Sequence, residues 1–331
     1  MTVNVGMIGT GVIGRTHLKA LKAIEEARVV AVCDIVPGKA EEALAEAGLN
    51  GVTCYRDHRE MLARERLDAV FIMLPPYAHG PEWDVIEAGC ALFVEKPVHL
   101  HLAEAEAIRD AIARKGLISC AAYMTRYRRS VQRVRELLGE VEQPTLLTGG
   151  WFGGAYFVPW WINKDMSGGQ HLEQTTHTFD IARYLFGEVD TLYASFSKGA
   201  VKAEGYTIED ASSVNLQFKN GAIGNIMSCC ALTTDGGGVH LSVYTNKFVA
   251  HFNGWNMSVD IYTGKKGQSQ VEHIEGEPNI FEIEDRAFIR AVAENRQNLI
   301  LSSYADGVET LRLSVEASNS MKTGMPIRLS R

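Results

Sequence analysis

The sequence predicts an α/β domain with a doubly wound parallel sheet, followed by an α+β domain with a large, mostly antiparallel open sheet. Three observations lead to this prediction. The chain has 331 residues, about twice the ~150 residues of a typical domain. Apolar runs alternate with helix-like segments up to about residue 122, which is typical of a parallel sheet. After Gly187 the apolar period changes from 3.6 to 2, which is typical of antiparallel strands.

The first elements predict a dinucleotide site. The apolar run VNVGMI leads into GTGVIG at residues 9–14, and a helical pattern follows. Between a strand and a helix, the first glycine permits a tight turn, the second lets the backbone approach a pyrophosphate, and the third lets helix and strand pack closely. The helix N-terminus then offers N–H groups to the phosphates. We therefore predict that the cofactor is bound by Gly9, Gly11, Val12, Ile13 and Gly14.

The second predicted strand ends in a carboxylate that favours NAD. The run RVVAVCD ends at Asp34, twenty residues after Gly14. A carboxylate at this place accepts hydrogen bonds from a ribose 2′-hydroxyl and repels a 2′-phosphate. Ile35 and Val36 follow, with no arginine that would suit the phosphate. NAD is therefore favoured over NADP.

The later strand ends of this domain carry further candidate residues. Ligands bind doubly wound sheets at the carboxyl edge, so we expect Pro75, His79, Glu95 and Lys96 near the cofactor. Lys96 precedes a proline, which restricts its backbone and defines its direction. The position of Lys96 fits two roles equally well. It could transfer a proton or hold a substrate hydroxyl, or it could form a surface ion pair with Glu95. The predicted helices here span residues 38–47, 58–65, 79–88 and 102–115.

A second cluster of titratable residues lies in the stretch GGQHLEQTTHTFD, residues 168–180. It contains His171, Glu173, His177 and Asp180, and it runs into a helical pattern. On one helix Glu173, His177 and Asp180 would share a face. This set suits proton transfer, with His177 as the candidate base. A metal site is the alternative, but HxE followed by HxxD has no familiar zinc spacing, and we predict no metal.

With GTGVIG, Asp34, the EKP at 95–97 and GG-x-H-x-E-xxx-H-xx-D in hand, the whole chain resembles the glucose-fructose oxidoreductase, inositol dehydrogenase and MocA family. The resemblance implies an NAD(P)-binding Rossmann domain over residues 1–122, and a substrate-binding and oligomerisation domain over 123–331. It implies hydride transfer between the nicotinamide and a secondary hydroxyl or ketone of a sugar, cyclic polyol or sugar derivative.

The resemblance also implies roles for single residues. Lys96 is similar to the family lysine that orients the reacting hydroxyl, and His177 is similar to the general base. Glu173 stands where the polyol dehydrogenases commonly have aspartate, which argues against inositol as the substrate. The longer side chain of Glu173 suits a catalytic role in orienting His177. Leu74 stands where the family commonly has threonine before Pro75.

Aromatic residues crowd just before the second cluster. Sugars present C–H faces that pack on aromatic rings, while their hydroxyls need polar partners. For any single one of these aromatic residues, a place in the core or at an interface is at least as consistent with the sequence as a place in a sugar pocket. The residues predicted to bind substrate are Tyr123, Arg126, Trp151, Trp161, His171 and Asp180.

The rest of the second domain is predicted as an antiparallel meander. Alternating runs from VDTLYASFS to QVEHI are joined by turn signals such as Asn220-Gly221. One face of such a sheet packs on helices, and the other is usually covered by a partner subunit. We therefore expect a homodimer or homotetramer formed through this sheet. Further helices are predicted at 128–138, 283–294 and 304–321.

Composition excludes some partners. The net charge is −7 without a long basic run, which argues against nucleic-acid binding. The sequence shows no signal peptide and no apolar run of the ~18 residues that a membrane span needs, so we expect a cytoplasmic protein without a membrane partner. Two other functions stay open: an NAD-dependent glycosidase of this fold that oxidises its substrate transiently, and a non-catalytic protein that senses sugars or nucleotides.

Overall fold

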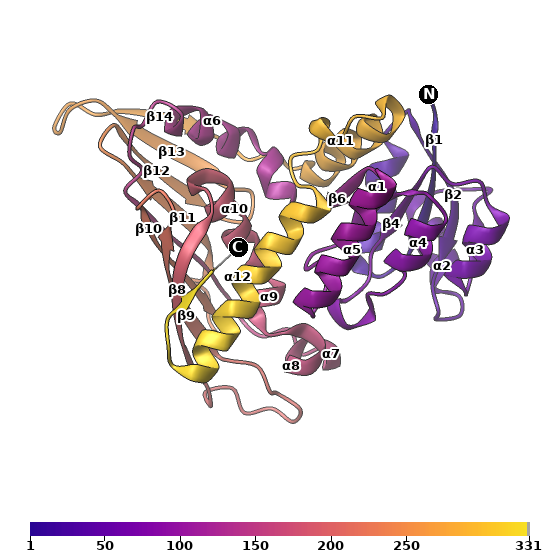
Figure 1. The fold of residues 1–331 in the computed structure, drawn as a ribbon, viewed down its shortest axis with the longest axis horizontal. Helices are drawn as coiled ribbons and strands as arrows, with labels where there is room; N and C mark the ends of the chain where they lie inside the picture. The colour runs from indigo at the N-terminus through magenta and orange to yellow at the C-terminus, as the bar shows by residue number, and fades with distance from the viewer. Residues whose placement is uncertain (330–331) are drawn as a thin grey trace. The chain divides into compact units, whose positions relative to one another are not determined.

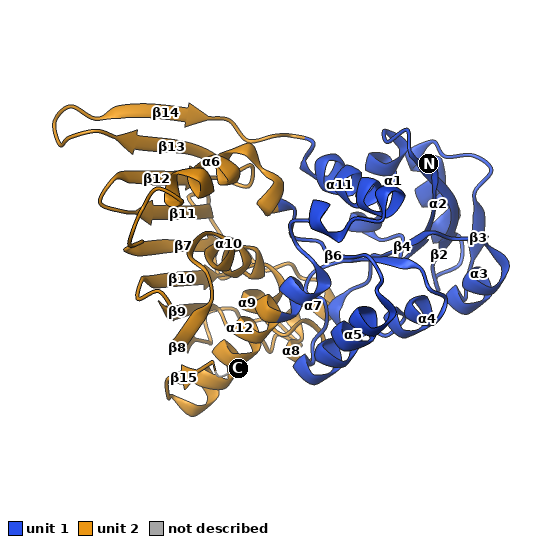
Figure 2. Ribbon diagram, turned by 45° about the horizontal axis from the view of Figure 1, so that its top comes forward, with its two compact units in different colours: residues 1–124, 279–308 blue, residues 125–278, 309–331 orange. Residues whose placement is uncertain are grey.

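The computed structural model describes residues 1–329, which form two compact units, coloured separately in Figure 2. Unit 1 contains residues 1–124 and 279–308, and unit 2 contains the remaining described residues, 125–278 and 309–329. The sequence did not indicate that residues 279–308 belong with the first unit. They do so because Phe288 and Ile289 are part of its hydrophobic core.

Unit 1 is built on a six-stranded parallel sheet in the order β3-β2-β1-β4-β5-β6. This is the doubly wound order, and its reversal point between β1 and β4 is where such sheets bind dinucleotides. The predicted Rossmann architecture is confirmed. The strands are β1 (Val3–Ile8), β2 (Ala27–Cys33), β3 (Thr53–Tyr55), β4 (Ala69–Ile72), β5 (Ala91–Val94) and β6 (Ser119–Ala121).

Helices connect these strands. The helix predicted from His79 begins only at Glu82, because the backbone of His79 is extended and Glu82 Oε2 accepts a hydrogen bond from the Gly80 N–H at 2.6 Å. The helices are α1 (Val12–Lys22), α2 (Lys39–Ala47), α3 (His58–Arg64), η1 (Pro76–Ala78), α4 (Glu82–Glu87), α5 (Leu102–Lys115), α11 (Ile280–Glu294) and η3 (Gln297–Leu299).

Unit 2 is built on a nine-stranded sheet in the order β14-β13-β12-β11-β7-β10-β9-β8-β15. The predicted simple meander is wrong at one place, since β7 lies between β11 and β10 and pairs with β10 in parallel. Gly149 and Gly150 permit this: a Cβ at Gly150 would lie 2.3 Å from the Met227 carbonyl oxygen. The strands are β7 (Leu146–Phe152), β8 (Val189–Ser197), β9 (Ala211–Phe218), β10 (Ile223–Cys229), β11 (Gly238–Tyr244), β12 (Phe248–Asn253), β13 (Ser258–Thr263), β14 (Gln270–Ile274) and β15 (Ile327–Arg328).

One face of this sheet packs on helices (Figure 1). Buried side chains of α6 (Arg129–Leu138), α10 (Thr176–Phe186) and the last turns of α12 (Tyr304–Thr323) share a core with it. The outward-pointing residues Tyr193, Ile223 and Met227 are exposed. The remaining helices near the site are η2 (Met124–Tyr127), α7 (Pro159–Ile162), α8 (Lys164–Ser167) and α9 (Gln170–Glu173).

Within residues 1–329, no helix combines the length and the apolar composition that crossing a bilayer requires.

Candidate active site

The glycine turn after β1 has the geometry that a pyrophosphate needs. Gly9 has φ of +92°, and a Cβ there would lie 2.5 Å from the Met73 carbonyl oxygen. A Cβ at Gly14 would lie 2.4 Å from the Gly9 carbonyl oxygen, so both positions require glycine. A Cβ at Gly11, in contrast, would meet no described atom within 4 Å. The backbone at Gly11 is therefore open beside the N-terminus of α1, where a phosphate group fits.

Asp34 lies at the end of β2 as an ionised carboxylate. Its Oδ2 accepts hydrogen bonds from the Thr10 N–H at 2.9 Å and the Thr10 hydroxyl at 2.8 Å, and its Oδ1 accepts one from the Val36 N–H at 3.0 Å. Burial alone would raise the pKa of Asp34, but these hydrogen bonds lower it. A carboxylate accepts about four hydrogen bonds, so Asp34 retains capacity for a ribose hydroxyl.

Lys96 directly follows β5 and is held by a buried ionic network. The Glu95 Oε2 atom accepts a hydrogen bond from the Lys96 N–H at 2.8 Å. The other oxygen of Glu95, Oε1, lies 3.7 Å from His17 Nε2. His17 Nδ1 in turn lies 2.8 Å from Asp285 Oδ1. The side chains of His17 and Asp285 are both fully buried, so the backbone of Lys96 is tied to α1 and α11 through Glu95.

The environment of His17 makes it a buried cation. Its ring is surrounded by Phe71, Phe93 and Phe281, with ring centroids 5.2 to 5.9 Å away. Burial would lower the pKa of His17, but Asp285 and Glu95 outweigh burial and raise it to about 10. Burial raises the pKa of Asp285, and the charge of His17 opposes that rise.

His79 and Pro75, which the sequence predicts to lie near the cofactor, follow β4. His79 Nδ1 lies 2.5 Å from Glu82 Oε1, and both side chains are fully buried. Burial would raise the pKa of Glu82, but His79 and the backbone N–H groups of Gly80 and Glu82 together lower it. His79 and Glu82 therefore form a second buried histidine–carboxylate pair. Pro75 immediately precedes η1.

The helix prediction for Glu173 is wrong. Glu173 is the last residue of α9, and His177 belongs to the separate helix α10. The helix is interrupted because the Thr175 N–H bonds to the Gln170 carbonyl at 3.0 Å, five residues back, which adds a residue to the turn. Glu173 Oε2 instead accepts a hydrogen bond from Trp161 Nε1 at 2.8 Å. Trp161 itself is buried.

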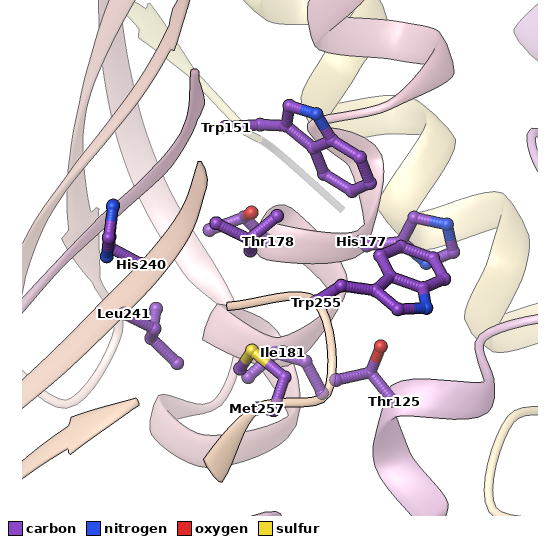
Figure 3. A pocket seen from close by; sticks show the side chains of 10 residues that line it. Thr125, Trp151, His177, Thr178, Ile181, His240, Leu241, Trp255 and Met257 are labelled. Carbon is purple, nitrogen blue, oxygen red and sulfur yellow. The ribbon is translucent and has the colours of Figure 1, made fainter. Parts of the chain in front are cut away.

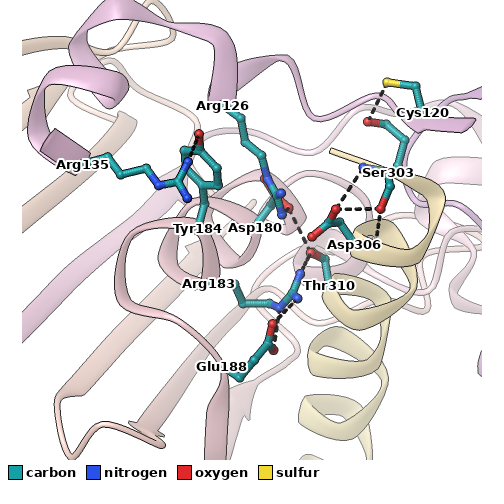
Figure 4. Close-up of polar contacts among 11 residues, drawn as sticks. Cys120, Arg126, Arg135, Asp180, Arg183, Tyr184, Glu188, Ser303, Asp306 and Thr310 are labelled. Carbon is teal, nitrogen blue, oxygen red and sulfur yellow. Dashed lines mark hydrogen bonds and ion pairs between the residues drawn. The ribbon is translucent and has the colours of Figure 1, made fainter. Parts of the chain in front are cut away.

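Three of the residues predicted to bind substrate have protein partners in unit 2. Arg126 donates hydrogen bonds to both oxygens of Asp180 at 2.7 and 2.8 Å, and the Thr310 hydroxyl donates a third to Asp180 at 3.0 Å (Figure 4). His171 Nε2 lies 2.8 Å from the Ser318 hydroxyl. Burial lowers the pKa of His171 to about 3, so His171 is neutral. Tyr123, which the sequence also predicts to bind substrate, is fully buried in unit 1.

His177 lines a pocket within unit 2 (Figure 3). The pocket holds about 330 Å³ of empty space, part of it open to solvent. Trp151 lies nearly parallel to the His177 ring at 6.1 Å, and Trp255 meets that ring edge-on at 6.0 Å. The described lining residues include no Asp, Glu, Lys or Arg; they are Thr125, Trp151, His177, Thr178, Ile181, Val239, His240, Leu241, Trp255 and Met257.

Sequence reasoning missed two parts of this arrangement. Trp255 follows the turn Asn253-Gly254 between β12 and β13, and an aromatic residue beside a turn was the only local signal. His17 and Asp285 are 268 residues apart, and no local pattern links them. Across residues 1–329, no group of three or more His, Cys, Asp or Glu side chains is arranged to hold a metal ion.

Comparison with known proteins identifies the family. Residues 3–123 match the oxidoreductase family with an NAD-binding Rossmann fold, and residues 131–249 match the GFO/IDH/MocA C-terminal domain. The chain is 30% identical to the inositol 2-dehydrogenase of Rhizobium meliloti (strain 1021), over 97% of each chain. The chain belongs to the GFO/IDH/MocA family. As a GFO/IDH/MocA protein with the glycine turn and Asp34 in place, it is an NAD-dependent oxidoreductase, and the predicted enzyme class and cofactor are confirmed.

Two further similarities agree with the GFO/IDH/MocA assignment. The chain is 26% identical to the scyllo-inositol 2-dehydrogenase (NAD(+)) of Bacillus subtilis (strain 168), over 99% of this chain and 96% of the relative. A levoglucosan dehydrogenase solved in complex with NADH superposes with a TM-score of 0.90 at 18% identity, over the whole of both chains. At that identity the likeness confirms the fold: a Rossmann unit and a second unit with a large, mostly antiparallel sheet.

Proposed function

We propose that this oxidoreductase transfers a hydride between NAD and a secondary hydroxyl or ketone of a sugar, a cyclic polyol or a sugar derivative. The observation that carries the proposal is the placement of His177 in a pocket walled by two tryptophans. Aromatic rings pack on the C–H faces of sugars. Relatives named inositol 2-dehydrogenase, and a similar structure solved with NADH and levoglucosan, support a substrate of this type.

The proposal assigns the cofactor to unit 1. The backbone at Gly9, Gly11, Val12, Ile13 and Gly14 would hold the pyrophosphate, and Asp34 would bind the ribose. When bound, NAD supplies the hydride acceptor. Pro75, His79 and Glu95 would shape the cofactor site from the ends of β4 and β5.

Lys96 and His177 divide the substrate chemistry in this proposal. The ammonium group of Lys96 donates a hydrogen bond to the reacting oxygen and holds it in place. The imidazole of His177 accepts the hydroxyl proton while the C–H bond on the same carbon breaks, which is general base catalysis. Glu173 acts indirectly in this proposal, because it contacts Trp161 and lies on a separate helix from His177.

The test is a screen of sugars, inositols and their keto forms with NAD and NADP, followed by NADH absorbance. His177→Ala and Lys96→Met should each lower turnover by about 10² or more, while NAD affinity changes little. His273→Ala, an exposed histidine on β14, is the control and should retain activity. Full turnover in His177→Ala, or cleavage of a glycoside without net NADH, would contradict the proposal.

We also infer that the exposed sheet face of unit 2 forms a homo-oligomer. Three large apolar side chains on the outer face, Tyr193, Ile223 and Met227, are 38 to 54% exposed on β8 and β10. An exposed sheet of this kind is usually covered. Light scattering should give the mass of a dimer or tetramer, and Ile223→Glu with Met227→Glu should reduce that mass.

A further inference from the structure

We propose that the pocket of unit 2 selects a neutral sugar that carries a deoxy or O-alkyl position facing the pocket floor. This inference rests on the proposed function and specifies its substrate class. It predicts that the enzyme prefers such a sugar over the fully hydroxylated parent. The proposal depends on two observations: the charged residues nearest in sequence to His177 have protein partners, and the floor of the pocket is apolar.

The charged residues around His177 in the sequence are not part of the pocket lining. Asp180 is fully buried and bonded to Arg126 and Thr310. Glu173 accepts the Trp161 N–H. A fully hydroxylated polyol is commonly held by carboxylate and guanidinium groups, because these form strong charge-assisted hydrogen bonds. Among the described lining residues, unit 2 offers the substrate two histidines, His177 and His240, and otherwise residues that carry no charge.

The pocket also contains residues that can form hydrogen bonds with a substrate. The lining residues with polar side-chain groups are Thr125, Trp151, His177, Thr178, His240 and Trp255. These can bind the reacting hydroxyl and one neighbouring hydroxyl, with the sugar ring against the indoles.

The floor of the pocket is apolar. Ile181 on α10, Leu241 on β11 and Met257 after β12 are between 1 and 4% exposed (Figure 3). Val239 precedes Leu241 by two residues on β11, so both side chains point to the same sheet face. A substrate group that enters this part of the pocket meets hydrocarbon side chains from three different elements.

The consequence for a substrate follows from desolvation. A hydroxyl placed against this floor would lose its water partners without gaining a protein partner, which is unfavourable. A methyl or methylene group in the same place gains from burial. Hydrophobic pockets discriminate between such pairs by roughly 10- to 100-fold in kcat/KM. We expect the preference of this enzyme to lie in that range.

The first experiment compares matched substrate pairs on the wild-type enzyme with NAD. Each pair is a parent hexose or inositol and its monodeoxy or mono-O-methyl derivative, scanned through every position. One position should give a derivative with kcat/KM at least about tenfold above the parent. If parents are oxidised as well as or better than every derivative, the inference fails while the proposed function holds. If no sugar is oxidised, both fail.

The second experiment changes the floor. Val239→Thr places a hydroxyl in the pocket at nearly constant volume, and Val243→Thr makes the same change in the buried core four residues further along β11. Val239→Thr should reduce the preference to less than about threefold, and Val243→Thr should retain it. Equal preference in both variants would overturn the assignment. Quenching of tryptophan fluorescence on titration with each sugar gives an affinity that does not depend on turnover.

Discussion

Lys96 in unit 1 and His177 in unit 2 have opposite surroundings. Behind Lys96 lie the buried charges of Glu95, His17 and Asp285, linked over 2.8 to 3.7 Å. Around His177 lie Trp151, Trp255 and neutral or apolar side chains. Buried ion pairs fix the positions of their side chains but cost desolvation. Aromatic and apolar pocket walls instead contact the bound ligand directly. Under the proposed function, unit 1 would supply a catalytic group that is the same for every substrate, and unit 2 would determine which substrate fits.

The comparison is tested most strongly by removing the central charge of unit 1. His17→Gln leaves Asp285 buried without its cation, so the free energy of unfolding should fall by about 3–5 kcal/mol. Urea denaturation at neutral pH measures this. The matched control is His58→Gln, which breaks a partly exposed histidine–aspartate pair with Asp84 in the same unit. The control should cost about 1 kcal/mol or less, and equal losses would contradict a special role of the buried pair.

The same pair gives the stability a defined pH dependence. The pKa of His17 is raised from about 6.5 to about 10 on folding, so its contribution is complete below about pH 6.5. It is lost as the pH rises through about 10. The difference between the wild type and His17→Gln should therefore shrink from pH 6.5 to pH 10. A difference that grows over this interval would show that His17 is not a buried cation.

The walls of the pocket in unit 2 should affect substrate binding and leave the fold intact. Trp255 is 43% exposed and lies 5.4 Å from Trp151, so Trp255→Ala removes a wall without opening the core. KM for the sugar should rise about tenfold, which corresponds to ~1.4 kcal/mol, while KM for NAD stays constant. Trp83→Ala on α4 in unit 1 is the control. An equal rise in both KM values for Trp255→Ala would place Trp255 outside the substrate site.

Glu95 tests whether the charges behind Lys96 act on its chemistry. Glu95→Gln keeps an oxygen that can accept the Lys96 N–H but removes a negative charge between Lys96 and His17. A nearby negative charge stabilises a protonated amine. The alkaline limb of the pH profile of kcat/KM should move to lower pH, with activity at neutral pH reduced about tenfold. Glu87→Gln, which affects only the exposed Lys115, is the control. An unmoved alkaline limb would show that Glu95 has only a structural role.

The predictable part of this protein follows from local patterns. The strand, the glycine turn and α1 are contiguous, and Gly9 and Gly14 have steric reasons that a sequence pattern already contains. The alternation of strands and helices in unit 1 likewise predicts the parallel sheet. A dense run of titratable residues that continues into a helix singles out His177 in the sequence, and His177 lines the pocket of unit 2.

The unpredicted part depends on long-range contacts. Nothing near β7 in the sequence indicates that it pairs in parallel with β10, whose residues lie 77 positions later. Trp255 reaches the pocket through the β12–β13 turn, and Asp285 reaches His17 from α11. The break between α9 and α10 depends on a single backbone hydrogen bond, from Thr175 to Gln170. The helical period of 3.6 residues in the sequence pattern does not reveal such a break.

Glu173 is where the sequence pattern and the structure separate, and it provides the smallest expected effect. With Glu173 on its own short helix and bonded to Trp161, Glu173→Gln keeps an acceptor for the indole N–H. Turnover should therefore fall by less than about threefold. Trp161→Phe, which removes the same hydrogen bond from the other side, should give a similar value. A loss near 10² in Glu173→Gln alone would instead mean that its charge acts on His177. Unit 2 would then also hold its catalytic group by buried charge, and the contrast with unit 1 would no longer stand.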